Sequence, residues 1–402
     1  MTGMGGINLG LFIKPMTEDL GMGESVFGFG QTARLIGFSA TSWWIGRYLD
    51  RHGARLPLVI AGLVAGASVI GLAAITDGWQ LIFLLFVSGL TGLYMAGGTL
   101  YATVPISAWF VKNRGKALSI TFLGLPIGIF ITPPLTQFLI DEIGWRQAWL
   151  VLGITGTAII MVAAAIVRRR PEDMGLLPDG GAVPEPGETG KPSHVIAEVS
   201  WTREEAMKSS AFWRLASVDG LRMGAMGTVG IYRVSYFIDQ GVDAQIVAFA
   251  LSFEAVMAAL ISVPTGWAVD RVPPRFLAAA STMAMVVTLG AIIQADTVAG
   301  VFLASGLFGV AAASFDVSRA ATWPNYFGAA NIGKIRGIAM PIGLSLSAIS
   351  APLTGIIKDE TGEFLLAWIA AAVALAAASA ILLFTPKPKA PVREPAAGLS
   401  PQ

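Results

Sequence analysis

The sequence predicts an all-α polytopic membrane protein with twelve transmembrane helices, arranged as two six-helix bundles related by a pseudo-two-fold repeat. Three observations predict this fold class. The residue types AVILMFWYC make up 54% of the 402-residue chain, whereas charged residues reach only 13%, about half of the roughly 25% usual in soluble domains. The chain divides into apolar runs of about 20 residues, which is the length needed to cross about 30 Å of hydrocarbon. Several segments of the first half also return in the second half.

In the first half, charged or turn-forming residues interrupt the apolar runs and set the predicted helix ends. We expect helices near Met1 to Ile13, Ser25 to Gly46, Leu56 to Ile75, Gln80 to Phe110, Ala117 to Ile140 and Gln147 to Val167. The first is short, because it spans only about 20 Å, and no basic residue precedes it. We therefore expect a truncated first helix whose natural start lies upstream. A signal peptide is not expected, since there is no basic n-region and no small-residue cleavage site.

The second half gives six further runs. They lie near Ala211 to Ile238, Gln245 to Val269, Phe276 to Ala295, Val298 to Pro324, Ile338 to Ile357 and Phe364 to Phe384. The predicted organisation is a bundle over 1–167, a linker over 168–209, a bundle over 210–384 and a tail over 385–402. The linker is rich in Pro, Gly, Glu and Asp, as solvated linkers are, and the low-complexity tail has a composition typical of disorder.

The charges outside the helices predict the orientation. When alternate loops are taken together, nineteen Lys and Arg fall on the side of the linker and both chain ends, and only Lys14, Arg146 and Lys358 fall on the other side with twelve acids. Loops rich in Lys and Arg stay in the cytoplasm. We therefore expect a multi-pass protein of the cell (plasma or inner) membrane, monomeric, with both termini and the linker cytoplasmic.

Several classes of function are excluded by composition. There is no cysteine, hence no disulfide, thiolate nucleophile, iron–sulfur centre or cysteine–zinc site. The two histidines, His52 and His194, are far apart, and no phosphate-binding loop pattern occurs. The run from Gly28 to Ala33 fits a loose dinucleotide pattern, but no strand precedes it, so close helix packing is the better interpretation. We expect no enzyme activity, no cofactor, no metal and no nucleic-acid partner.

Charged residues inside the predicted helices carry most of the remaining information. Each costs about 2.5–3.5 kcal/mol on membrane-insertion scales, so something must offset it. The seven are Arg34, Asp219, Arg222, Arg233, Glu254, Asp316 and Arg319. Asp219 with Arg222, and Asp316 with Arg319, have the i,i+3 spacing of residues on one helix face and could be self-neutralised structural pairs. Arg34 and Arg233 have no such local acid.

These residues form the candidate site. A planar guanidinium can hold a carboxylate through two hydrogen bonds, so we expect an anionic substrate bound by Arg34, Arg222, Arg233 and Arg319, with hydroxyl donors from Tyr94 and Tyr232. The proton-coupling candidates are Glu254, Asp219 and Asp316, with Glu254 the best because its chain position places a lone carboxyl group inside a helix. Two alternatives stay open: Glu254 as a structural partner of an arginine on helix seven or ten, and the tyrosines as packed or interfacial side chains. The Gly and Pro cluster of helix five (124–134) predicts a bend that could serve as a hinge.

The repeat contains the most specific motif. Gly46-Arg-Tyr-Leu-Asp50-Arg51-His-Gly-Ala-Arg55 returns 220 residues later as Gly266-Trp-Ala-Val-Asp270-Arg271-Val-Pro-Pro-Arg275, and Arg114-Gly115 and Asp141-Glu142 return at similar offsets. This loop resembles the signature loop of the major facilitator superfamily. The runs GLFIKPMTEDLG, GWRQAW and RRRPEDMGLLPDG are similar to the branch of oxalate/formate antiporters and monocarboxylate transporters.

The signature loop also has a chemical interpretation. Asp50 can accept hydrogen bonds from a neighbouring helix N-terminus, and Arg51 and Arg55 can pair with acids or lipid phosphate. Such a gating loop would hold the bundles together in one state and release them in the other. The alternative is a basic loop that only fixes topology.

The resemblance implies a secondary active transporter that works by alternating access, and a substrate arginine in helix eight. In the oxalate/formate type it also implies a lysine in helix eleven. Here helix eight has Glu254 and neither helix has a basic residue within its predicted span. Either Arg34, Arg233 and Arg319 take over the role, or the substrate differs. We expect a proton-coupled or exchange-driven carrier of a small, monocarboxylate-like organic anion. The alternatives are a carrier of a drug or neutral solute with structural arginine pairs, and a non-transporting solute sensor.

Overall fold

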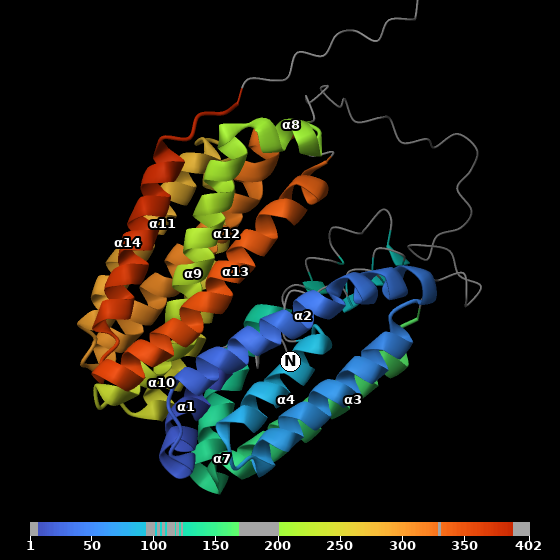
Figure 1. Ribbon diagram of the computed structural model, residues 1–402, viewed down its shortest axis with the longest axis vertical. Coiled ribbons are helices and arrows are strands. Elements are labelled where there is room, and N and C mark those ends of the chain that lie inside the picture. Colours follow the sequence, from blue (N-terminus) through green and yellow to red (C-terminus); the bar gives the residue numbers. More distant parts are fainter. Residues whose placement is uncertain are drawn as a thin grey trace, which may run out of the picture.

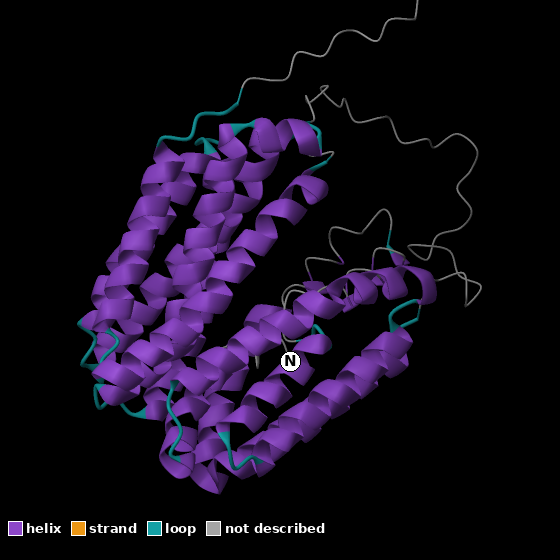
Figure 2. Ribbon diagram, in the orientation of Figure 1, coloured by secondary structure: helices purple, strands orange, loops and turns teal. Residues whose placement is uncertain are grey.

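The structure is a computed structural model that describes residues 7–93, 101–102, 105–106, 109–110, 117, 120–121, 124–168, 201–328 and 331–388. Within these residues all regular secondary structure is helical (Figure 2). Seven of the described helices are long and apolar enough to span a membrane, and α4 is a shorter apolar helix. The predicted fold class of an all-α polytopic membrane protein is confirmed. The count of twelve helices stays a prediction, because most of residues 94–123 lie outside the described part.

The first half contains five described helices and one 3₁₀ turn. They are α1 (Ile7–Leu20), α2 (Ser25–His52), α3 (Arg55–Gly71), η2 (Leu72–Ala74), α4 (Gly78–Leu90) and α7 (Gly124–Ile166). The long α7 is interrupted at Gly144, whose φ of 79° is not helical. It therefore corresponds to the predicted helices five and six, joined without a loop.

The second half follows the prediction closely. It contains α8 (Arg203–Lys208), α9 (Ser210–Asp239), α10 (Ala244–Val269), α11 (Pro274–Ile293), α12 (Val298–Phe327), α13 (Ile332–Thr361) and α14 (Leu365–Leu383). The short α8 was not predicted. The sequence feature that could have predicted α8 is its capping box, in which Thr202 and Glu205 each accept a hydrogen bond from the other's backbone N–H.

Two predicted helices of the first half need correction. The first does not end at Ile13, because α1 continues through Lys14 and Pro15 and stops before Gly21, whose φ is 63°. The fourth does not run unbroken to Phe110, because α4 ends at Leu90 and Gly92 has a φ of 68°. Glycine reaches positive φ at no steric cost, so it ends a helix inside an otherwise apolar run.

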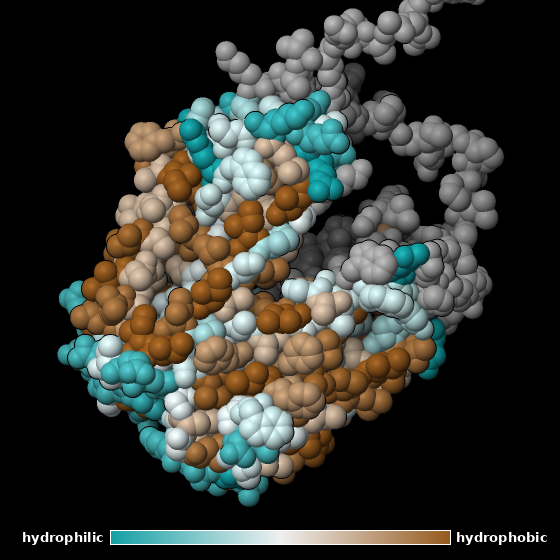
Figure 3. All heavy atoms as spheres, in the orientation of Figure 1, coloured by the Kyte–Doolittle hydropathy of each residue, from teal (hydrophilic) through white to brown (hydrophobic). Residues whose placement is uncertain are grey.

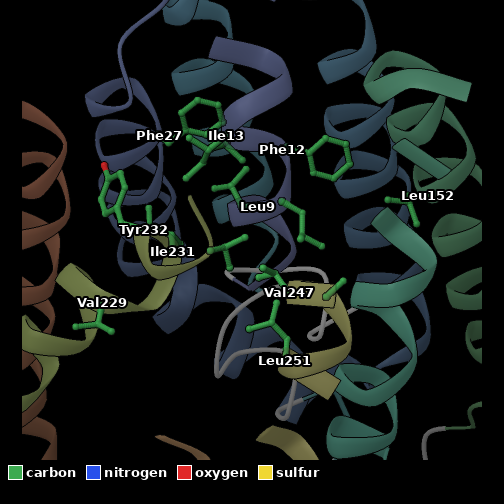
Figure 4. Close-up of a cluster of buried hydrophobic side chains, with 14 of the residues drawn as sticks. Leu9, Phe12, Ile13, Phe27, Leu152, Val229, Ile231, Tyr232, Val247 and Leu251 are labelled. Atoms are coloured by element: carbon green, nitrogen blue, oxygen red, sulfur yellow. The ribbon is translucent and has the colours of Figure 1, made fainter. Parts of the chain in front are cut away.

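Among the described residues, the two halves meet at one end of the molecule (Figure 1). We call this the closed end; it contains the connecting residues 21–24, 240–243 and 362–364. The opposite end, with Trp201, α8 and residues 384–388, is the linker end. From the closed end, α2 packs along α13, α7 along α10, and α1 against α9. One hydrophobic core joins both halves there and includes Phe12 and Phe27 of the first half and Ile231 and Leu251 of the second (Figure 4).

Glycines allow α2 and α13 to touch backbone to backbone. A Cβ on Gly28 would lie 2.6 Å from the carbonyl oxygen of Ala351, and one on Gly355 would collide with the backbone of Ser25. The run from Gly28 is thus a helix-packing element, as its apolar surroundings indicate. We call this crossing the glycine contact.

The surface agrees with a membrane environment. Figure 3 shows hydrophobic residues over the middle of both halves and hydrophilic ones gathered toward the ends. Large apolar side chains such as Leu260, Val263 and Ile159 are more than half exposed. A belt of exposed apolar side chains on a helical protein is expected where lipid replaces water.

Candidate functional site

The intramembrane charges of the second half are paired between helices. Arg233 in α9 lies with Nη2 2.6 Å from Glu254 Oε2 in α10. Its guanidinium also stacks on the ring of Phe308 in α12, 3.8 Å from the ring centre. Arg233 has no acid nearby on its own helix, and its partner comes from another helix, because sequence spacing does not report contacts between helices. Nε and Nη1 of Arg233 have no hydrogen-bond partner among the described residues.

Four further charges form a second group, at the linker-end part of α9 and α12. Arg222 lies 3.3 Å from Asp316, and Arg319 lies 3.5 Å from Asp219. The pairing predicted within each helix is thus replaced by pairing across two antiparallel helices. The i,i+3 spacing puts both members of a pair on one face, and the facing helix then supplies the opposite charge. Trp323 also donates to Asp219 over 3.2 Å.

A cavity of about 440 Å³ lies between the halves, lined by α2, α9 and α13. Figure 3 shows the surface hollowed between the halves toward the linker end. Arg222 lines the cavity and stacks on Phe315, 4.1 Å from the ring centre. Its partner Asp316 is 65% exposed. Arg222 is thus a buried cation on the cavity wall, whereas its partner Asp316 is not among the described lining residues.

The other arginines lie away from this wall. Arg34 is buried in α2, between residues that line the cavity, and its carbonyl is packed against Gly89 of α4. Arg34, Arg233 and Arg319 are not among the described lining residues. The structure thus brings one of the four predicted arginines to the cavity wall.

The two candidate tyrosines do not line the cavity in the described part. Tyr94 lies outside the described residues. Tyr232 is fully buried and donates to the carbonyl oxygen of Glu24 over 3.2 Å, with its ring tilted against Phe364. Its place is the closed end, where it packs between the halves.

The closed end has a polar cluster that the sequence did not predict as a site. Ser235 donates to both carboxylate oxygens of Glu24, over 3.0 and 2.9 Å. Asp359 accepts from the backbone N–H groups of Glu24 and Ser25, over 2.8 and 3.1 Å, at the start of α2. Burial raises the pKa of Glu24 above its ordinary value, while nearby Lys14 and Ser235 partly oppose this.

Two lysines complete the cluster. Lys14 of α1 pairs with Asp239 of α9 and lies 3.6 Å from Glu24. Lys358 of α13 donates to Asp239 over 2.7 Å. We call these six residues the closed-end cluster: Lys14, Glu24, Ser235, Asp239, Lys358 and Asp359. The sequence feature that could have predicted this cluster is that Lys14 and Lys358 are two of only three cations in the loops that carry twelve acids.

The two gating-loop motifs lie at the linker end. The side chains of Gly46, Asp50 and Arg51 are outside the described part, and Arg55 is exposed at the start of α3. In the second copy, Gly266 lies near the end of α10 and Asp270 is exposed. Arg271 donates to the carbonyl of Trp267 over 3.0 Å, and Arg275 donates to that of Thr385 over 2.7 Å. Both arginines bond within their own half.

The repeat extends into the membrane. At the same offset of 220 residues, Arg34 corresponds to Glu254, and Gly89 corresponds to Gly309. A Cβ on Gly89 would collide with the carbonyl of Arg34, and one on Gly309 with that of Glu254. Equivalent helices thus make the same close contact, but with opposite charges at the equivalent position.

Two helical halves joined at one end, with a charged cavity between them, define a polytopic membrane carrier. Residues 1–241 match the Major Facilitator Superfamily. The chain belongs to this family and is a transporter of a small molecule, not an enzyme. This favours transport over the alternative of a solute sensor.

Relatives and solved structures agree with this assignment. The chain is 26% identical to monocarboxylate transporter 11 of Mus musculus over 340 residues, which cover 78% of this chain and 68% of that protein. It is 21% identical to monocarboxylate transporter 13 of Bos taurus over 377 residues, or 90% and 83%. The resemblance to the monocarboxylate branch is confirmed, at sequence identities of 21–26%.

Among solved structures, a bacterial homologue of the human lysosomal transporter Spinster, in an inward-facing and occupied conformation, has a TM-score of 0.72 at 13% identity, covering 94% of this chain and 92% of its own. A D-xylose–proton symporter also has a TM-score of 0.72, at 14% identity and 98% and 96% coverage. These likenesses show the fold.

Proposed function

We propose that this chain is a secondary active carrier of a small organic anion, coupled to a proton or a counter-anion. The observation that carries the proposal is Arg222, a buried cation on the wall of the cavity between the halves. A guanidinium in a partly desolvated site binds a carboxylate through paired hydrogen bonds. The names of the monocarboxylate transporters among the relatives support a carboxylate as the anion.

Coupling follows from competition for Arg222. Asp316 holds the guanidinium through one contact of 3.3 Å and is largely exposed, so a substrate carboxylate can replace it. A counter-anion would compete for the same guanidinium, so that one anion is exchanged for the other. Asp219 keeps Arg319 away from the same site by pairing with it. Glu254 is held by Arg233, so a proton taken up by Glu254 would release this arginine.

The proposal includes orientation. Placing the linker and both termini in the cytoplasm makes the linker end the cytoplasmic face of a cell-membrane protein. The conformation described above is then open toward the cytoplasm, and the closed-end cluster is the outer gate.

Uptake into proteoliposomes tests the proposal. Labelled mono- and dicarboxylates are offered with and without a pH gradient, and protein-free liposomes give the passive background. We expect saturable carboxylate uptake that Arg222→Gln reduces by tenfold or more. Arg214→Gln is the matched control, because Arg214 lies on the same helix but is exposed and bonds the carbonyl of Phe384. Equal uptake by the two variants would contradict the proposal.

One observation favours a second candidate, a carrier of a drug or neutral solute. Arg222, Arg233 and Arg319 each have a carboxylate within 3.5 Å, which fits structural ion pairs. Saturable uptake of an uncharged or cationic compound, with none of any carboxylate, would select this candidate.

A further inference from the structure

The cavity lies near mid-height of the molecule. On α2 its lining residues run from Gln31 to Phe38, and on α9 from Arg222 to Ile231. At 1.5 Å per residue, these positions are about 9–26 Å from the closed-end termini of their helices. Its volume of about 440 Å³ falls in the range of about 300–1,000 Å³ typical of small-molecule sites. A two-carbon acid would fill only a small part of it.

The described wall of the cavity is mostly apolar and has a single cation. Of the described residues that line the cavity, Arg222 is the one with an ionisable side chain, and Gln31 and Ser347 are the polar ones. The rest of the lining is apolar or glycine. The described wall therefore offers one cation, which can pair with one carboxylate of a ligand. Against the described part of the wall, a second carboxylate would meet apolar atoms and no second cation, which is strongly unfavourable.

The apolar wall is built from adaptable side chains. Met223 and Met226 of α9, Met340 of α13, and Leu35 and Phe38 of α2 are among the apolar residues that line the cavity. Methionine is unbranched and polarizable, so it fits apolar groups of different shapes. Such a wall favours an extended hydrocarbon body over a small polar one.

One glycine in this wall keeps space open. Gly230 lines the cavity, and a Cβ built on it would meet no atom of the described residues within 4 Å. Gly227, one turn earlier, differs because its Cβ would lie 2.8 Å from the carbonyl of Ser347. Gly227 therefore serves helix packing, whereas Gly230 leaves volume for a ligand.

We propose that the cavity selects monocarboxylates with an apolar body of several carbons, and that Gly230 sets the longest body accepted. The carboxylate binds Arg222 and the body lies along Met223, Met226 and Met340. This inference rests on the proposed anion function, and it adds which anions are preferred and which residue limits their size.

Binding to the full chain in nanodiscs tests the proposal, with empty nanodiscs as background. Calorimetry measures the dissociation constants of straight-chain acids from acetate to decanoate, of succinate, and of the 1-alkanols of equal length; Gly230 lies about 12 Å along α9 from Arg222. Each added methylene should tighten binding about fourfold while space remains. Succinate should bind at least tenfold more weakly than butyrate.

The variants locate the size limit. Gly230→Leu should leave acetate binding within twofold and remove the gain from the longer acids. Gly230→Ala adds a single methyl group and should give an intermediate loss. Gly290→Leu on α11 is the matched control, because its Cβ also meets no atom within 4 Å and it is not among the described lining residues. It should behave as the unmodified chain does.

The outcomes distinguish the two claims. If the acids bind with no dependence on length, or if Gly230→Leu weakens acetate and decanoate equally, the size selection is wrong and the anion function stands. If the 1-alkanols bind as tightly as the acids of equal length, the anion function itself fails and this inference fails with it.

Discussion

At the closed end, polar side chains of one half bond to the other half, whereas at the linker end they bond within their own half. Asp359 of α13 bonds the start of α2, and Ser235 of α9 bonds Glu24. At the linker end, Arg275 bonds Thr385, and the backbone N–H of Trp201 donates to the carbonyl of Phe327. The closed-end bonds must therefore break before that end can open, while the linker-end bonds can persist in both states. Loss of a cross-half contact should shift the conformational equilibrium, and loss of a contact within one half should lower fold stability.

The largest effect is expected from a contact within one half. Arg233→Met leaves the Glu254 carboxylate buried without its partner, which costs about 3–5 kcal/mol of unfolding free energy. Denaturant unfolding in detergent measures this loss. Arg233→Met combined with Glu254→Met should regain most of it. A double variant no more stable than the single one would show that the pair is not what stabilises this region.

Next comes the glycine contact between the halves. Gly355→Leu places a side chain against the Ser25 backbone, and overpacking costs about 1–3 kcal/mol. The population of the conformation in which the closed end is shut should fall about 5- to 150-fold relative to the conformation in which that end is open. Because the chain has no cysteine, spin labels on Glu18→Cys and Glu363→Cys report the separation without a native background. Gly290→Leu should not change that separation.

A smaller shift is expected from the cap that Asp359 provides to α2. Asp359→Asn removes the charge and one acceptor, which costs about 1 kcal/mol, or about fivefold in population. The same spin-label pair measures it. Asp296→Asn, an exposed acid between α11 and α12 at the same end, supplies the matched loss of charge. An equal shift in both variants would mean that net charge, not the cap, holds the end closed.

The smallest effect is a pH dependence. Glu24 has a pKa raised by burial in the closed end, and we expect an ordinary pKa once that end opens to water. The closed end is then fully favoured below the ordinary pKa, and this advantage is lost as the pH rises through the raised one. Glu24→Gln should flatten that dependence of the label separation on pH. An unchanged profile in Glu24→Gln would show that Glu24 is not the source of the dependence.

Charged or turn-forming residues bound the apolar runs of the second half and predicted its long helices to within three residues, except that α13 begins six residues before and ends four residues after its predicted span. The end of α4 was missed, since Gly92 stands inside an uninterrupted apolar run. The pairing of Arg222 with Asp316 could not be predicted either, because spacing along one helix does not report which face of another helix lies opposite. The domain boundaries and the gating role of Asp50 and Arg51 stay predictions.

The site was predicted in part. Arg222 and Asp316 were chosen because a charge inside the membrane must be offset, and both lie at or beside the cavity wall. Glu254 pairs with an arginine of helix seven, which is the structural alternative that the sequence left open. The closed-end cluster was missed because each of its members is an ordinary loop or helix-end charge until the two halves are assembled.

The glycine contact also has a mechanical consequence. From Gly28 to the end of α2 at His52 is about 36 Å, and from Gly355 back to the start of α13 at Ile332 is about 35 Å. With the contact as a fulcrum, a rigid rotation of about 15° would move either far end by about 9 Å. The two helix lengths measured from the glycine contact are nearly equal, so the far ends of α2 and α13 would move by similar distances. A small repacking among glycines is thereby amplified into the opening of a passage wide enough for a small solute.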